Sequence, residues 1–110
     1  MSLDPDKIYA VVEKCGLEWS DKKAAFEFLD DMTKTVLADL TTDTMTGHKC
    51  SKSEAETRAY AHPRYKEHLT SLASARRAWL VAEVKWKSSI MLADLRRSEE
   101  STRRAEANIR

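Results

Sequence analysis

The sequence predicts an all-α protein in which a short helix precedes a long antiparallel helical hairpin of coiled-coil type. Only two glycines and two prolines occur in 110 residues, too few for the tight turns that an all-β fold requires. Apolar residues instead recur at steps of three and four, the spacing of amphipathic helices. We therefore expect one helical domain over residues 1–110, with helices at about 5–15, 20–44, 52–61 and 63–107.

The first helix is predicted from the residues at its two ends. Asp4 and Pro5 mark its start, since a carboxylate caps free amide groups and proline suits the first helical position. Gly16 follows the last apolar residue and favours a C-terminal cap there. A helix of about eleven residues is too short to be stable alone, so it must pack on another element.

The second helix has a helix-start signal and one continuous apolar stripe. Ser20 is a favourable N-cap and Asp21 complements the dipole of the first turn. Threonines 41, 42 and 44 and then Gly47 weaken the helix, so we expect it to end near Thr44. The stripe contributes these residues to the predicted intrachain core: Phe28, Leu29, Met32, Val36 and Leu40.

A third helix should begin near residue 52. Two overlapping capping boxes precede it, Ser51 with Glu54 and Ser53 with Glu56. Pro63 disfavours helical backbone at the preceding residue and lacks an amide donor. Two outcomes stay open at residues 61–63: a kink in one helix, or a break after which Pro63 starts another.

The chain after Pro63 carries apolar residues on two opposite sides of one long helix. The first side repeats every seven residues and supplies the rest of the predicted core: Leu72, Trp79, Trp86 and Ile90. At ~100° per residue a second set falls opposite: Leu80, Val84, Met91 and Leu95. At ~1.5 Å per residue this helix is about 65 Å long, whereas the second helix covers little more than half of that length.

The second apolar side therefore predicts an interface with another copy of the chain. Exposing four large apolar residues together would create a patch larger than most monomers tolerate. The expected assembly is a homodimer or a higher homo-oligomer. An alternative stays open, in which the first helix folds back and covers part of this side with Ile8, Val11 and Val12.

Charge is distributed unevenly along the chain. The net charge is +1, but residues 1–45 carry ten acidic side chains and five lysines, and every arginine follows residue 50. The arginines near the C-terminus are candidates for contact with DNA or with an acidic protein partner: Arg96, Arg97, Arg103, Arg104 and Arg110. Alternatively, ion pairs four residues apart with Glu99, Glu100 and Glu106 would stabilise a solvated helix.

The sequence predicts no catalytic residues, no cofactor and no metal site, and hence a protein that is not an enzyme. The histidines and cysteines lack the paired spacing of a structural zinc site. No serine or cysteine stands in a local arrangement with a histidine and a carboxylate. Cys15 and Cys50 are expected to be free thiols in a reducing cytoplasm. No apolar run is long enough for a membrane span, so no membrane contact is expected.

The second half of the chain carries an Ala-Tyr-Ala motif at residues 59–61, a following Pro63 and Tyr65, and a late Arg-Ser dipeptide at residues 97 and 98. With these motifs, residues 54–107 resemble a group of small helical proteins of tailed phages and prophages, which implies a location in the cytoplasm of a bacterial host cell. The chain departs from the group at Leu95 and Arg96, where members place a tryptophan before that dipeptide. Such proteins often stand beside genes for homologous recombination and single-strand annealing. The resemblance implies a phage or prophage accessory protein that binds DNA or a phage or host recombination or replication protein. A structural or adaptor module that binds an acidic protein, without nucleic acid, is the alternative.

Overall fold

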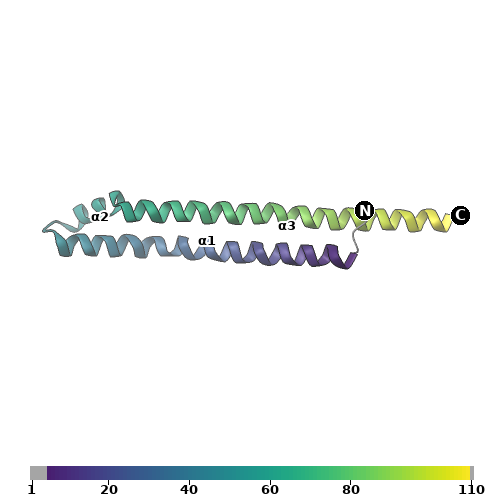
Figure 1. Cartoon of the computed structure of the whole chain (residues 1–110). Coiled ribbons are helices and arrows are strands. Elements are labelled where there is room, and N and C mark those ends of the chain that lie inside the picture. The colour runs from purple at the N-terminus through teal and green to yellow at the C-terminus, as the bar shows by residue number, and fades with distance from the viewer. Residues whose placement is uncertain (1–4, 110) are drawn as a thin grey trace. The chain divides into compact units, whose positions relative to one another are not determined.

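The computed structural model describes residues 5–109, which form three helices and no strand (Figure 1). They are α1 (Pro5–Gly47), α2 (Lys52–Ala61) and α3 (Pro63–Ile109). The predicted all-α class is confirmed. The chain divides into two compact units. Unit 1 contains the described residues through Asp21 and those from Trp79 onward, and unit 2 contains Lys22–Ala78.

Helix α1 is continuous where two helices were expected. The predicted end at residue 15 and new start at residue 20 are wrong, because α1 passes through Gly16 and Ser20. Gly16 does not adopt the positive φ of a C-terminal cap. A Cβ placed on it would lie 2.9 Å from Nε1 of Trp86 on α3. The glycine therefore stays helical and allows the Trp86 ring to approach the α1 backbone.

The C-terminal part of α1 tolerates several threonines because their hydroxyls bond within the helix. Thr41, Thr44 and Thr46 each donate a hydrogen bond to the backbone carbonyl four residues earlier, at 2.8–2.9 Å. These bonds satisfy the hydroxyls without interrupting the helical backbone. The helix consequently reaches Gly47, beyond the end expected near Thr44.

Helices α2 and α3 are separated by a single residue, His62. Ser51 caps α2 and its hydroxyl accepts a hydrogen bond from the Glu54 amide at 3.2 Å, as the first capping box predicts. His62 has extended backbone, with φ −70° and ψ 139°. Its Nδ1 accepts a hydrogen bond from the Arg64 amide at 3.0 Å, so His62 also caps α3. Of the two outcomes left open, the break before Pro63 is the one observed.

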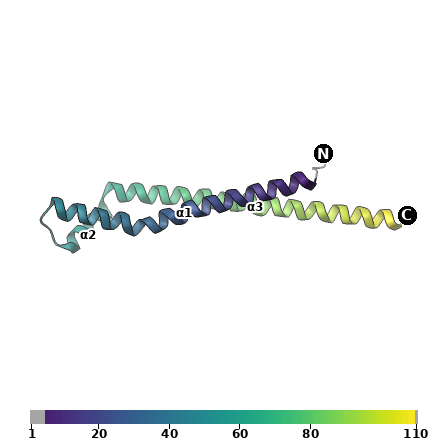
Figure 2. The same cartoon turned by 90° about the horizontal axis from the view of Figure 1, so that it is seen from below.

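In unit 2, segments of α1 and α3 run side by side in opposite directions (Figures 1 and 2). A hydrogen bond of 2.9 Å joins Thr33 Oγ1 to His68 Nε2 across the two helices. Nearby, the Arg76 guanidinium lies 5.2 Å from the centre of the Phe26 ring, within the range of a cation–π interaction. Ala55 and Ala59 of α2 are fully buried. Their spacing of four places both on one face of α2, and that face packs against the rest of the unit.

In unit 1, the N-terminal part of α1 packs on the C-terminal part of α3. The Trp19 and Trp86 rings lie 4.8 Å apart, centre to centre, and are tilted by 32°. Ile8 and Ala82 are also buried in this unit, and the buried Ser89 hydroxyl donates a 2.6 Å hydrogen bond to the Trp86 carbonyl. We call the surface on which α1 and α3 pack, within each unit, the seam.

Most of the predicted core residues lie on the seam. Leu40 is buried, and these are half-buried: Leu29, Met32, Val36, Leu72, Trp79, Trp86 and Ile90. Phe28 was assigned wrongly, because 64% of its surface is exposed. Two residues along a helix correspond to a turn of about 200°, so Phe26 takes the inward position and Phe28 points out. Thr33 and His68 also lie on the seam, where they share a hydrogen bond. Because both are polar, they interrupt the apolar pattern from which the seam could be predicted.

Candidate interaction surfaces

The strongest candidate site is an apolar surface on α3 that faces away from the seam. We call it the outer face, defined by Leu80, Val84, Met91 and Leu95. Their exposed fractions are 46%, 64%, 72% and 57%. The residues between them on the opposite side, Ala82 and Ser89, are buried. The predicted opposition of two surfaces on one helix is thus present, and no part of α1 in unit 1 covers the outer face.

Other exposed apolar residues lie in unit 1. Val81 and Leu92 lie at the margin of the outer face and are 44% and 40% exposed. On α1 in the same unit, Val11 and Leu17 are exposed as well. Single exposed apolar residues are ordinary, but a contiguous group of this kind marks an interaction surface.

The seam explains why α1 leaves the outer face uncovered. Seam positions on α3 recur every seven residues from Tyr65 to Ala93, and each has a companion three residues later, such as Ala75 and Ala82. Small companions allow α1 to approach closely, and large tryptophans fill the remaining space. The fold-back of Ile8, Val11 and Val12 onto the outer face, kept as an alternative, does not occur. Ile8 is buried and Val12 half-buried on the seam, and Val11 is 49% exposed.

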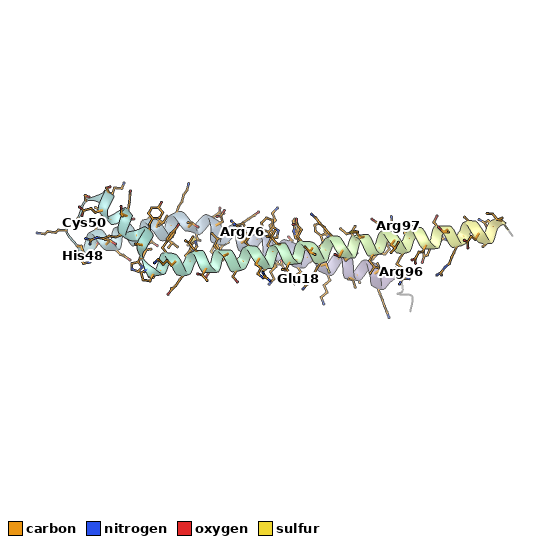
Figure 3. The ribbon with its side chains drawn as sticks, turned by 90° about the horizontal axis from the view of Figure 1, so that it is seen from above. Glu18, His48, Cys50, Arg76, Arg96 and Arg97 are labelled. Carbon is orange, nitrogen blue, oxygen red and sulfur yellow. The ribbon has the colours of Figure 1, made fainter. Side chains whose placement is uncertain are left out.

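The C-terminal arginines form a second candidate surface, and two of them are engaged within unit 1. Arg96 and Arg97 are neighbours on α3 (Figure 3). Arg97 donates a 2.9 Å hydrogen bond from Nη2 to the Tyr9 hydroxyl. This bond raises the pKa of Arg97 above its ordinary value, with further contributions from the charges of Tyr9 and Asp94. Arg96 is half-buried and forms a 3.5 Å ion pair with Glu99. Glu99 thus pairs three residues back, whereas the sequence predicted a pair with Arg103.

Beyond this point α3 is exposed on all sides. Every residue from 97 to 109 is exposed, Arg103 and Arg104 among them. Tyr9 lies beside Arg97 and α1 begins at Pro5, so α3 extends past the first described residue of α1 by about two turns. Arg110 lies outside the described residues. The acidic Glu100 and Glu106 share this segment, which leaves it mixed in charge.

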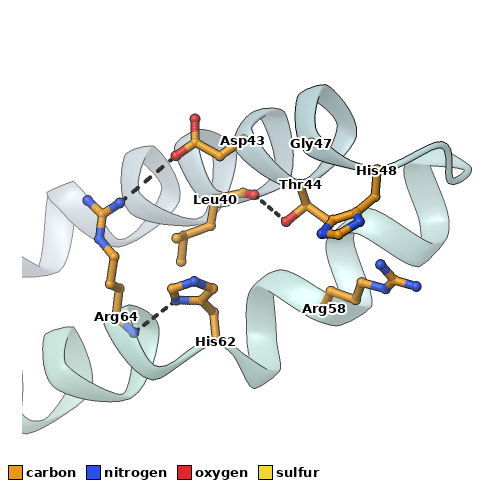
Figure 4. Close-up of a pocket in the computed structure, with 8 residues that line it drawn as sticks. All are labelled: Leu40, Asp43, Thr44, Gly47, His48, Arg58, His62 and Arg64. Carbon is orange, nitrogen blue, oxygen red and sulfur yellow. Dashed lines mark hydrogen bonds and ion pairs between the residues drawn. The ribbon is translucent and has the colours of Figure 1, made fainter.

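A polar pocket of about 320 Å³ lies in unit 2 where the three helices meet (Figure 4). Asp43, His48, Arg58, His62 and Arg64 line it together with apolar and small residues. Asp43 pairs with Arg64 at 3.9 Å, and both side chains are about two-thirds exposed. Arg58 and Arg64 point in different directions in Figure 4. The pocket therefore presents no convergent set of charges.

The described residues also bear on the free thiols, metal ligands and membrane spans considered in the sequence. Cys15 and Cys50 are free thiols, as predicted. Within residues 5–109 no three or more side chains of His, Cys, Asp or Glu gather where they could hold a metal ion. None of the described helices combines the length and the apolar character needed to cross a membrane.

Sequence reasoning found the outer face and missed the contacts of Gly16 and Tyr9. A signal for the α1 side of the seam was present, since Val12, Trp19, Phe26, Thr33 and Leu40 recur every seven residues. That series continues through Gly16 without interruption and would have predicted one helix. The Tyr9 contact with Arg97 joins residues 88 positions apart, and no local pattern indicates it.

No protein-family model, no curated protein and no solved structure matches this chain. The resemblance to phage proteins consequently stays a prediction.

Proposed function

We propose that the protein is a non-enzymatic assembly module that self-associates through the outer face of α3. One observation carries this proposal: four large apolar side chains on one side of a helix are 46–72% exposed in a single chain. Complete burial of a side chain of this size stabilises a complex by roughly 1.5–3 kcal/mol relative to full exposure. A second protein surface that removes these residues from water therefore lowers the free energy substantially.

The long coiled-coil-like hairpin and the homo-oligomeric state belong to this proposal. The seven-residue spacing on both α1 and α3 supports the hairpin, since such spacing is typical of helices that pack along their length. A cytoplasmic phage or prophage accessory role, acting on a recombination or replication protein, is supported by the sequence resemblance alone.

The decisive experiment measures particle mass by light scattering. The unaltered chain is expected to be a dimer or larger at micromolar concentration. Met91→Asp places a charge at the most exposed residue of the outer face and should convert the particles to monomers, because an unpaired charge in an apolar interface is costly. A monomeric mass for the unaltered chain at high concentration would refute self-association.

Phe28→Asp provides the matched control for that substitution. Phe28 is 64% exposed, comparable to Met91 at 72%, but it lies on α1 in unit 2. The same change from apolar to acidic should leave the mass unaltered there. Equal loss of mass in both variants would show that general apolar exposure, and not the outer face, drives assembly.

Contact with DNA is the second candidate function, and one observation favours it. Arg103 and Arg104 are exposed on a helical segment that projects past α1. Fluorescence anisotropy with labelled single- and double-stranded DNA at low salt should detect binding that weakens steeply as salt rises. Arg103→Ala with Arg104→Ala should abolish it. Absence of DNA binding at low salt would favour the alternative, an adaptor whose arginines contact an acidic protein.

A further inference from the structure

The geometry of self-association can be derived from the outer face, and this inference rests on the proposed function. Two sets of positions, each repeating every seven residues, run along the outer face and include Val81 from its margin. The first set is Val81, Ser88 and Leu95, and the second, three residues further on, is Val84, Met91 and Ser98. All six residues are exposed. This is the arrangement of core positions in a two-stranded coiled coil.

The residues on either side of these core positions carry charge and determine how two copies fit. Lys87 and Asp94 flank one side, seven residues apart, in line with Leu80. Lys85, Leu92 and Glu99 flank the other side. The Lys87 side chain is 69% exposed and forms a long ion pair of 3.8 Å with Glu83 on the same helix. Such exposed pairs contribute little free energy, so Lys87 can exchange its partner at small cost.

A parallel pair of α3 helices brings like charges together. In that arrangement each flanking residue of the Lys87 side faces a residue of the opposite flank five positions further on in the partner. Asp94 then faces the partner's Glu99, and the symmetry repeats this repulsion a second time. Lys87 faces the partner's Leu92 and gains no opposite charge.

An antiparallel pair places each flank against the same flank of the partner. Three registers, that is, three relative positions of the two helices along their axes, keep the core positions aligned. Each register is identified by the residue at which the two-fold axis crosses α3. The register centred at residue 86 opposes Lys87 to the partner's Lys87 and Lys85 to the partner's Lys85. The register centred at residue 93 opposes Lys85 to the partner's Glu99 twice, but it also opposes Asp94 to the partner's Asp94. The register centred between residues 89 and 90 opposes Lys87 to the partner's Asp94 twice, and it brings no like charges together.

The same central register gives the best apolar contacts. It packs Val84 against the partner's Leu95 and Met91 against the partner's Ser88, each twice by symmetry. Ser88 is small, so the helices can approach closely at the centre. The register centred at residue 93 packs Met91 against the partner's Leu95, but it opposes Ser88 to the partner's Ser98 and Val84 to the partner's Thr102. Charge and packing thus select the same arrangement, and flanking charges commonly set the orientation of coiled-coil pairs.

We infer that two copies of this chain associate as a two-fold symmetric antiparallel pair along the outer face of α3, with the symmetry axis between residues 89 and 90. The partner is a second copy, because the face complements itself in both charge and shape. Each copy contributes the same surface, so the interface closes as a dimer and leaves no outer face free for a further chain.

Distances between spin labels test the arrangement. In a chain carrying Cys15→Ser and Cys50→Ser, Ser101→Cys provides one labelling site at the flank of the face. The inferred pair separates the two labels by about 23 residues along the axis, or ~35 Å. The registers centred at 86 and 93 give about 45 Å and 24 Å. A parallel pair holds the labels at the same height, separated mainly by the ~10 Å between helix axes.

A charge substitution distinguishes the two arrangements, because it should weaken an antiparallel dimer and strengthen a parallel one. Asp94→Lys faces Lys87 of the partner in the antiparallel pair and should weaken the dimer about tenfold. In a parallel pair the same change removes repulsion with Glu99 and would strengthen the dimer. Lys87→Glu combined with Asp94→Lys should restore most of the original affinity, as measured by sedimentation. Circular dichroism of each variant verifies that the helices remain formed.

The outcomes separate this inference from the proposed function. A monomer in the unaltered chain would overturn both. Dissociation of the dimer by Met91→Asp supports self-association in every case. A label distance near 10 Å, or a dimer strengthened by Asp94→Lys, would overturn the antiparallel arrangement and leave self-association standing. A label distance near 35 Å with a weakened and rescued Asp94→Lys dimer supports it.

Discussion

Units 1 and 2 are built from the same two helices but differ in how completely they cover apolar side chains. Among the described residues, fourteen large hydrophobic side chains are exposed, of which ten lie in unit 1 and four in unit 2. Unit 2 has a third helix, α2, whose Ala55 and Ala59 are fully buried. Unit 1 has only segments of α1 and α3. Each of two packed helices buries only the side that faces the other, so the second apolar side of α3 is not covered by the described residues of unit 1.

The largest effect on this comparison is expected from Trp86→Ala. The Trp86 ring packs on Trp19 and against Gly16 at the centre of the unit 1 seam. Removing a packed aromatic side chain costs about 3–5 kcal/mol of stability. Thermal unfolding followed by circular dichroism should show a marked loss. Ile109→Ala is the control, because Ile109 is 85% exposed, and its unfolding should be unchanged.

The two glycines give a matched pair, one in each unit. Gly16→Ala places a methyl group 2.9 Å from the Trp86 ring, which should cost about 1–3 kcal/mol through overpacking and exceed the ~1 kcal/mol gain in helix propensity. Gly47→Ala meets no atom within 4 Å and has no positive φ. It should be neutral or stabilising by up to ~1 kcal/mol. Chemical denaturation measures both, and a stabilised Gly16→Ala would contradict the close packing of Trp86.

A smaller effect is expected at the joint between α2 and α3 in unit 2. His62→Ala removes the Nδ1 acceptor of the Arg64 amide and should cost about 0.5–1.5 kcal/mol, the usual value of a helix cap. His62→Asn keeps a capping oxygen and should retain most of the stability. If both variants unfold at the same denaturant concentration as the unaltered chain, the cap contributes nothing.

The smallest effect should come from the ion pair at the same end of unit 2. Asp43 and Arg64 are 3.9 Å apart and largely exposed, and such pairs contribute roughly 0–1 kcal/mol. Asp43→Asn should therefore shift the denaturation midpoint barely, and added salt should erase the shift. A loss well above 1 kcal/mol would indicate that Asp43 has a further structural role.

The sequence predicted the helices and surfaces that follow a strong periodic pattern. The seven-residue series from Tyr65 to Ala93 placed Trp79 and Trp86 correctly on the seam, and the outer face follows directly from it. Prediction failed where one residue type serves two purposes. Gly16 indicated a helix end, yet it accommodates a ring from α3, and that contact depends on tertiary packing. Thr33 and His68 are polar, so only their mutual hydrogen bond explains their place in the seam.

The two opposite apolar sides of α3 restrict how its length can vary. Inserting one residue near position 85 turns every later side chain by ~100° about the helix axis. Ala93 would then turn away from α1, and Met91 and Leu95 would turn away from a second copy bound at the outer face. Seven added residues turn the helix by nearly two complete revolutions and almost restore both alignments. Natural variants of this chain should therefore gain or lose length in α3 by whole heptads, matched by equal changes in α1.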